Sequence, residues 1–70
     1  MTTFNPDYYC SNGVKVIDFI DAYNLSFSLG NVVKYIARAG HKQGEDKLTA
    51  LHKAYFYLLH EMAIEEKHNQ

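Results

Sequence analysis

The feature that most constrains the fold is an unbroken apolar spacing in the last third of the chain. Large apolar side chains recur every three or four residues, at Leu48, Leu51, Tyr55, Leu58 and Met62. That spacing places them on one side of an α-helix. Asp46 is a suitable N-cap, and we expect the helix to run to about Glu66. About twenty residues at 1.5 Å each make a helix roughly 30 Å long, the spine of the domain.

A second helix is expected between Leu29 and Gly40. Its apolar side chains share one side of the helix, namely Leu29, Val32, Val33 and Ile36. An opposite, narrow arc carries Asn31, Lys34 and Arg38. Ser26 or Ser28 is expected to cap the start of this helix, and Gly40 to end it in a left-handed conformation.

A first helix is expected over residues 14–23, followed by a turn at Asn24. The residues before it contain Pro6 and Gly13 and show no apolar period, which predicts an irregular arm. No segment alternates for long enough to predict a strand. We therefore predict an all-α, three-helix domain, with an arm over residues 1–13, a helical core over 14–66 and a tail over 67–70.

The composition of the 70-residue chain sets the class of protein. Apolar residues make up 47% and aromatic residues 14%, which argues against disorder. So much apolar material in one small domain suggests that part of it is buried between subunits, and we expect a homo-oligomer. The formal charge of -1 gives no support for general nucleic-acid binding, which needs a basic face.

The same sequence indicates a cytoplasmic protein. No run approaches the roughly 18 apolar residues of a membrane span. The first five residues lack the basic and apolar regions of a signal peptide. The single cysteine, Cys10, excludes an internal disulfide framework and leaves a zinc site without thiolate partners. Nothing in the sequence assigns a role to Cys10.

The polar arc of Asn31, Lys34 and Arg38 is the first candidate site. An amide and two cations that point one way from a rigid helix can receive a phosphate or a carboxylate. The alternative is a solvated face, or salt bridges to Asp18, Asp21 or Glu45. Gly30 beside the arc costs a helix up to about 1 kcal/mol relative to alanine, so it marks a close approach by a ligand or by another helix.

Other candidate contacts have two interpretations each. Asp18 and Asp21, three residues apart, are able to share a magnesium ion or to form the polar face of an amphipathic helix. Tyr8 and Tyr9 are able to stack on a base or to pack the arm against the helices. His41 is either a further donor to an anion or a solvated loop residue. The chain has no Gly-rich phosphate loop and no nucleophile with a plausible base.

Several short motifs together resemble a known family. They are Tyr9 with Gly13, Ile17-Asp18, Gly30-Asn31, Lys34-Tyr35, Arg38-Ala39-Gly40, Lys42, Leu51-His52-Lys53-Ala54 and Tyr57-Leu58. The chain resembles the small phage-encoded SaV-like family, a domain of unknown function whose members are often described as nucleotide kinases. The resemblance covers roughly residues 6–59. It implies a phage or prophage protein in the cytoplasm of an infected or lysogenic bacterial host.

The resemblance also implies roles for particular residues. Asn31, Lys34 and Arg38 would grip a nucleotide phosphate, Tyr9 would contact the base or sugar, and Asp18 would support magnesium or orient Lys34. Phosphoryl transfer, the activity that the kinase description implies, depends on positioning and on charge neutralisation by a metal.

Three positions depart from the family pattern and bear on that activity. Family members usually have histidine-tyrosine where this chain has Tyr8-Tyr9, a glutamate where it has Lys15, and an aspartate where it has Ala50. Losing these groups removes candidate metal ligands and bases. We therefore expect phosphate binding with weakened or lost catalysis, or alternatively a non-enzymatic module that inhibits or recruits a host protein.

Overall fold

The structure, a computed structural model, describes residues 10–11 and 13–69. Their elements are, in order, β1 (Cys10–Ser11), β2 (Val14–Lys15), α1 (Val16–Ala22), α2 (Phe27–Arg38) and α3 (Lys47–His68). The prediction of an all-α domain with three helices is confirmed. No helix in the described ranges is both long enough and apolar enough to span a membrane.

A short hairpin precedes the helices, where the sequence predicts only an irregular arm and the start of a helix. β1 and β2 pair antiparallel, with Cys10 opposite Lys15 and Ser11 opposite Val14. Gly13 has a φ of +80°, a conformation that glycine adopts without strain. Because Val14 and Lys15 are extended in this ladder, α1 begins two residues later than predicted, at Val16.

The predicted helix signals are confirmed at the atomic level. The Ser26 hydroxyl accepts a hydrogen bond from the Leu29 amide at 3.1 Å, so Ser26 rather than Ser28 caps α2. The Asp46 carboxylate caps α3 by accepting from the Thr49 amide at 2.9 Å. Asn24 and Gly40 adopt left-handed φ values of 52° and 82°, as a turn and a helix end require. α3 continues two residues beyond the predicted end, through His68.

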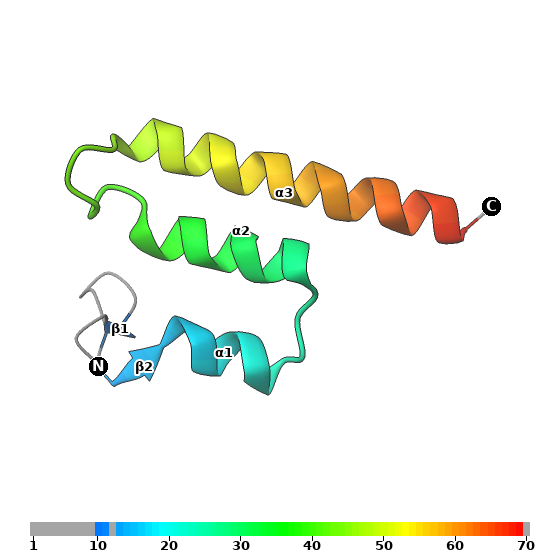
Figure 1. The fold of residues 1–70 in the computed structure, drawn as a ribbon, viewed down its shortest axis with the longest axis horizontal. Helices are drawn as coiled ribbons and strands as arrows, with labels where there is room; N and C mark the ends of the chain where they lie inside the picture. Colours follow the sequence, from blue (N-terminus) through cyan, green and yellow to red (C-terminus); the bar gives the residue numbers. More distant parts are fainter. Residues whose placement is uncertain (1–9, 12, 70) are drawn as a thin grey trace.

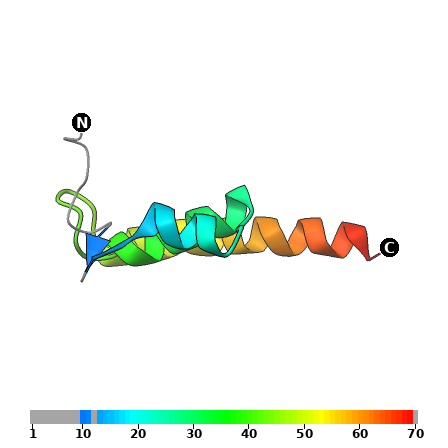
Figure 2. The same ribbon diagram turned by 90° about the horizontal axis from the view of Figure 1, so that it is seen from below.

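The three helices lie side by side in one layer, with α2 between α1 and α3 (Figure 1). α2 runs antiparallel to both neighbours, since each connection reverses the direction of the chain (Figure 1). Seen edge-on, the layer is thin, and no second layer of described residues covers either face (Figure 2). Stable domains usually bury the apolar sides of their helices between two layers, so this arrangement leaves apolar surface exposed.

α2 and α3 meet along an edge of small side chains. Ala50 is 0% exposed and Ala54 5% exposed, and they are the two buried apolar side chains in the part of the chain that the structure describes. Ser28 of α2 is also buried, and its Oγ lies 2.7 Å from His60 Nδ1 of α3. Small side chains let two helix backbones approach closely, and this contact holds the domain together.

The large apolar side chains lie mostly outside this contact. The predicted apolar row of α3 is exposed along its whole length, at Leu48, Leu51, Tyr55, Leu58 and Met62. On α2, Ile36 from the predicted apolar side is 56% exposed, whereas Arg38 from the polar arc is 6% exposed. A helix inside a single layer packs through its two edges, so the side that is buried here differs from the side that is most apolar.

Candidate functional site

Three cationic side chains surround the ring of Tyr35. The Arg38 Cζ atom lies 4.4 Å from the ring centroid, the Lys34 Nζ atom 5.4 Å and the Lys53 Nζ atom 5.6 Å. Lys34 and Arg38 are one turn apart on α2, whereas Lys53 comes from the first half of α3. The negative face of an aromatic ring attracts cations at these distances. We call Lys34, Tyr35, Arg38, Glu45 and Lys53 the Tyr35 cluster.

Glu45, in the loop between α2 and α3, joins two of these cations. Its carboxylate accepts hydrogen bonds from Arg38 Nε at 3.1 Å and Arg38 Nη2 at 3.0 Å, and from Lys53 Nζ at 2.7 Å. The Arg38 and Glu45 side chains are only 7% and 8% exposed, so this two-point pair fixes the guanidinium in place. The hydrogen bond from Lys53, followed by those from Arg38, holds the pKa of Glu45 below its usual value against the effect of desolvation.

The two lysines of the cluster keep capacity for another anion. Lys34 makes no hydrogen bond or ion pair with any residue in the described ranges, and its side chain is half-buried. Lys53 shares Glu45 with Arg38, but its side chain is 44% exposed. Arg38 therefore anchors the cluster, while Lys34 and Lys53 present positive charge beside it.

An open hollow of about 420 Å³ lies next to the cluster on α3. It is lined by Tyr35, Thr49, His52, Lys53, Phe56 and Tyr57. The rings of Tyr35 and Tyr57 stack with their centroids 5.8 Å apart and their planes 13° apart. Phe56 meets Tyr57 edge-on, with a centroid separation of 5.1 Å. The hollow thus combines flat aromatic walls with donors from Lys53, His52 and Thr49.

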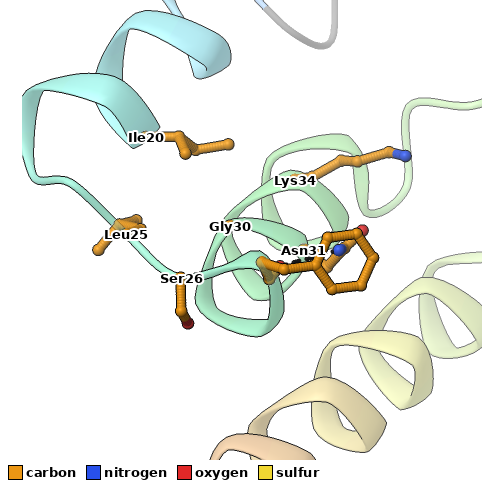
Figure 3. Close-up of a pocket in the computed structure, with 7 residues that line it drawn as sticks. Ile20, Leu25, Ser26, Gly30, Asn31 and Lys34 are labelled. Atoms are coloured by element: carbon orange, nitrogen blue, oxygen red, sulfur yellow. Dashed lines mark hydrogen bonds between the residues drawn. The ribbon is translucent and has the colours of Figure 1, made fainter.

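Asn31 belongs to a different, smaller hollow of about 200 Å³ between α1 and α2 (Figure 3). Its side-chain amide donates to the Phe27 carbonyl of its own helix at 2.9 Å. The Lys34 stem also lines this hollow, but its ammonium group extends away from Ile20 and Leu25 (Figure 3). Lys34 and Arg38 therefore both lie at the Tyr35 ring, whereas the Asn31 amide donates to the backbone of its own helix.

Gly30 is explained by the contact between α1 and α2. A Cβ atom at this position would lie 3.4 Å from the Ile20 Cγ2 atom, and Gly30 is buried. The alternative of a close helix approach therefore accounts for this glycine. Likewise, the predicted alternative of a salt bridge to Glu45 is confirmed for Arg38.

Three other predicted site residues lie on α1 or in the loop after α2. Asp18 and Asp21 are exposed on α1, and His41 is exposed in the loop after α2. Tyr9 lies outside the described residues. Within residues 10–11 and 13–69, no group of three or more His, Cys, Asp or Glu side chains is arranged to hold a metal ion. The magnesium site stays a prediction.

Sequence reasoning names Glu45 only as a salt-bridge partner and does not single out Lys53 or Tyr35 as site residues. Lys53 lies one turn before Tyr57 on α3, and Tyr57 stacks on Tyr35 of α2. The spacing of Lys53 and Tyr57 indicates a shared side of α3. It does not indicate which side of α2 they meet, because that depends on how the helices pack.

The comparisons with known proteins assign a family. No curated protein and no solved structure matches the chain. A family model described as a protein of unknown function, DUF3310, matches residues 4–59. The match spans more than half of the chain and includes every residue of the Tyr35 cluster. The chain therefore belongs to the DUF3310 family.

Proposed function

We propose that the protein binds a phosphate-bearing ligand of the nucleotide class at the Tyr35 cluster. The observation that carries the proposal is the Lys34 ammonium group, which lies beside Arg38 and Lys53 at one ring and has no ion pair with any described residue. Neighbouring like charges repel each other, and an anion placed among them removes that repulsion. A phosphate is a suitable anion because ammonium and guanidinium groups both donate to its oxygens.

The hollow next to the cluster suits the rest of a nucleotide. Its volume of about 420 Å³ lies within the range of small-molecule sites. Phe56 and Tyr57 offer aromatic surface for a base, since base-on-ring stacking contributes about 1–3 kcal/mol per base. In this proposal Lys34 and Lys53 hold the phosphate, Arg38 fixes the cluster through Glu45, and the rings hold the base.

The identity of the nucleotide comes from the family resemblance. We propose a phage or prophage protein of nucleotide metabolism whose ligand is a deoxynucleoside monophosphate. Tyr9 would add a base or sugar contact, and Asp18 would support magnesium carried in with the ligand. Asn31 would act at the edge of the site, since its amide already donates to Phe27.

Binding is proposed in preference to turnover. Ala50, where family members usually have an aspartate, is fully buried at the contact between α2 and α3. This position therefore packs two helices in the present chain and supplies no carboxylate. Lys15 lies in β2, where it replaces a second acidic group. Phosphoryl transfer needs metal-assisted charge neutralisation, and the loss of these acids weakens it.

Calorimetric titration tests the proposal. The parent protein is titrated with deoxynucleoside monophosphates and triphosphates, with and without Mg²⁺. We expect Lys34→Ala to weaken binding at least tenfold, because it removes the cation of the cluster that has no ion pair with a described residue. Lys67→Ala, which removes an exposed charge near the far end of α3, is the matched control and leaves affinity unchanged. The absence of binding by the parent protein under every condition would refute the proposal.

A second candidate is a non-enzymatic module that binds a host protein. Its support is that the cluster already holds a carboxylate, Glu45, and that Phe56, which lines the neighbouring hollow, is 61% exposed. Acidic groups and apolar side chains of a partner would meet these features. A stoichiometric host protein recovered with the parent protein, with no bound nucleotide, would favour this candidate over the first.

A further inference from the structure

We propose that the face of the layer opposite the Tyr35 cluster is covered by the same face of a second copy of the chain, with the two α3 helices antiparallel. This face carries Ile36 of α2 and the row Leu48, Leu51, Tyr55, Leu58 and Met62 of α3. The inference concerns a different surface from the proposed ligand site, so either can fail without the other.

The geometry of α3 separates the two faces. Ala50, Ala54 and Tyr57 follow a spacing of four and three residues and mark the edge that meets α2. At about 100° per residue, the row through Leu51 and Leu58 points roughly 110° away from that edge. Lys53 points away from the edge in the other sense, toward the Tyr35 cluster. The apolar row therefore lies on one flat side of the layer, and no other described element covers that side in the edge-on view (Figure 2).

The spacing of the row is that of a helix pair. Steps of three, four, three and four residues are the repeat with which two helices interlock along a coiled-coil seam. α2 and α1 do not use this seam, because α2 contacts the alanine edge and α1 lies beyond α2 (Figure 1). A partner that presents the same repeat fits it, and a second copy of α3 is such a partner.

The apolar area matches what a dimer requires. The six side chains of the face are 39–59% exposed. Each presents on the order of 100 Å² to solvent, so together they offer about 600 Å² per chain. A standard interface buries about 800 Å² per partner, rim included. An apolar area of about 600 Å² is at the upper end of the largest patch on a typical monomer, and such patches are often interaction sites. Covering it would supply the apolar burial that the three-helix layer lacks.

Charge beside the row selects the antiparallel arrangement. Lys47 flanks the start of the row, and Glu65 and Glu66 flank its end. Lys67 lies on the other side of the helix, about 140° from the row. A parallel pair would set these glutamates against their own copies. In an antiparallel pair, Leu51 can pack on Met62 of the second copy and Tyr55 on Leu58. This register places Lys47 beside the second copy's glutamates at the end of the row.

The oligomeric state tests the pairing. Light scattering coupled to size exclusion should give the mass of a dimer for the parent protein at micromolar concentration. Tyr55→Lys should give a monomer that keeps its helical circular dichroism, since Tyr55 is exposed on the surface of the layer. Phe56→Lys is the matched control, because Phe56 is equally exposed on another side of α3, and it should remain a dimer. The inference would be overturned if the parent protein were a monomer. It would also be overturned if the Tyr55→Lys variant and the Phe56→Lys variant were both dimers.

Disulfide trapping tests the orientation. In a Cys10→Ser background, Leu51→Cys and Met62→Cys are prepared as separate proteins. Alone, neither should form a disulfide-linked dimer, because like positions lie about 16 Å apart along the axis for an antiparallel pair. Mixed and equilibrated, they should cross-link. Rapid cross-linking of Leu51→Cys with itself would show a parallel pair and overturn the proposed orientation.

Discussion

The two faces of the helical layer differ in how far contacts within one chain pair their polar groups and cover their apolar side chains. On the Tyr35 cluster face, Arg38, Glu45 and Lys53 form a network with the aromatic rings, and Lys34 has no ion pair with a described residue. On the opposite face, large apolar side chains of α3 stay exposed within the described part of the chain. A face with a nearly complete polar network is suited to a small ligand. A face with an uncovered apolar row is suited to contact with another protein surface.

The strongest way to break both faces at once is to disturb the edge that they share. Ala54→Leu places a large side chain where Ala54 is 5% exposed between α2 and α3. Overpacking of this kind costs about 1–3 kcal/mol. The free energy of unfolding from urea titration should fall by that amount, and both ligand affinity and dimer mass should be lost together.

A matched control for this substitution is Lys67→Leu, which adds a leucine at an exposed position of α3. It should leave the urea midpoint nearly unchanged. An unchanged midpoint for Ala54→Leu as well would mean that α2 and α3 do not approach as closely as the alanine edge indicates.

A more selective break is Glu45→Gln, which acts on the cluster face alone. The substitution removes the charge that Arg38 and Lys53 share while keeping the size of the side chain. Because the Arg38 guanidinium is nearly buried, losing its carboxylate should lower the melting temperature by several degrees. Dimer mass should stay the same, since Glu45 lies off the apolar row. Dissociation of the dimer by Glu45→Gln would contradict the separation of the two faces.

The pH dependence of stability gives a second test of the cluster face, because the pKa of Glu45 is lowered in the folded protein. Hydrogen bonds from Lys53 and Arg38 lower this pKa from 4.5, and the bond from Thr49 lowers the pKa of Asp46. A lowered carboxyl pKa contributes stability that is present above the unfolded value and is lost as pH falls through the folded value. The difference in melting temperature between the parent protein and Glu45→Gln should be constant above about pH 5 and shrink below pH 4.5. A difference that grew on acidification would show that Glu45 is not the stabilised anion.

The contrast between the faces also explains what can be predicted from the sequence. Caps and turns depend on neighbouring residues, so the sequence identifies Asp46 and Gly40 correctly and narrows the α2 cap to Ser26 or Ser28, of which Ser26 is the cap. Spacing alone places Lys34 and Arg38 on one side of a helix. The burial of Arg38 and the arrival of Lys53 at Tyr35 depend on how α3 lies against α2, which the spacing within one helix does not contain.

The packing edge is the main element that the sequence conceals. The large apolar row of α3 is the strongest signal, yet the helix packs inside the chain through Ala50 and Ala54. Alanine contributes little to the hydrophobic periodicity of a sequence because its side chain is small. The same small side chain permits a close approach of two helices. A prediction from hydrophobicity therefore finds the exposed apolar face and misses the edge through which α2 and α3 pack.

The smallest expected effect is that of Gly30→Ala, and it separates the two explanations of this glycine. The new methyl group would lie 3.4 Å from Ile20 Cγ2, at the close limit of ordinary contact, while the helix gains up to about 1 kcal/mol in propensity. The two terms oppose each other, so we expect a net stabilisation of about 0.5 kcal/mol by urea titration. The methyl group also enters the small hollow of Figure 3, which shares Lys34 with the Tyr35 cluster. If the glycine serves only the contact between α1 and α2, ligand affinity stays unchanged. Weakened binding with unchanged stability would instead place the ligand in the hollow beside Asn31. The binding site would then lie between α1 and α2 and not at the Tyr35 cluster.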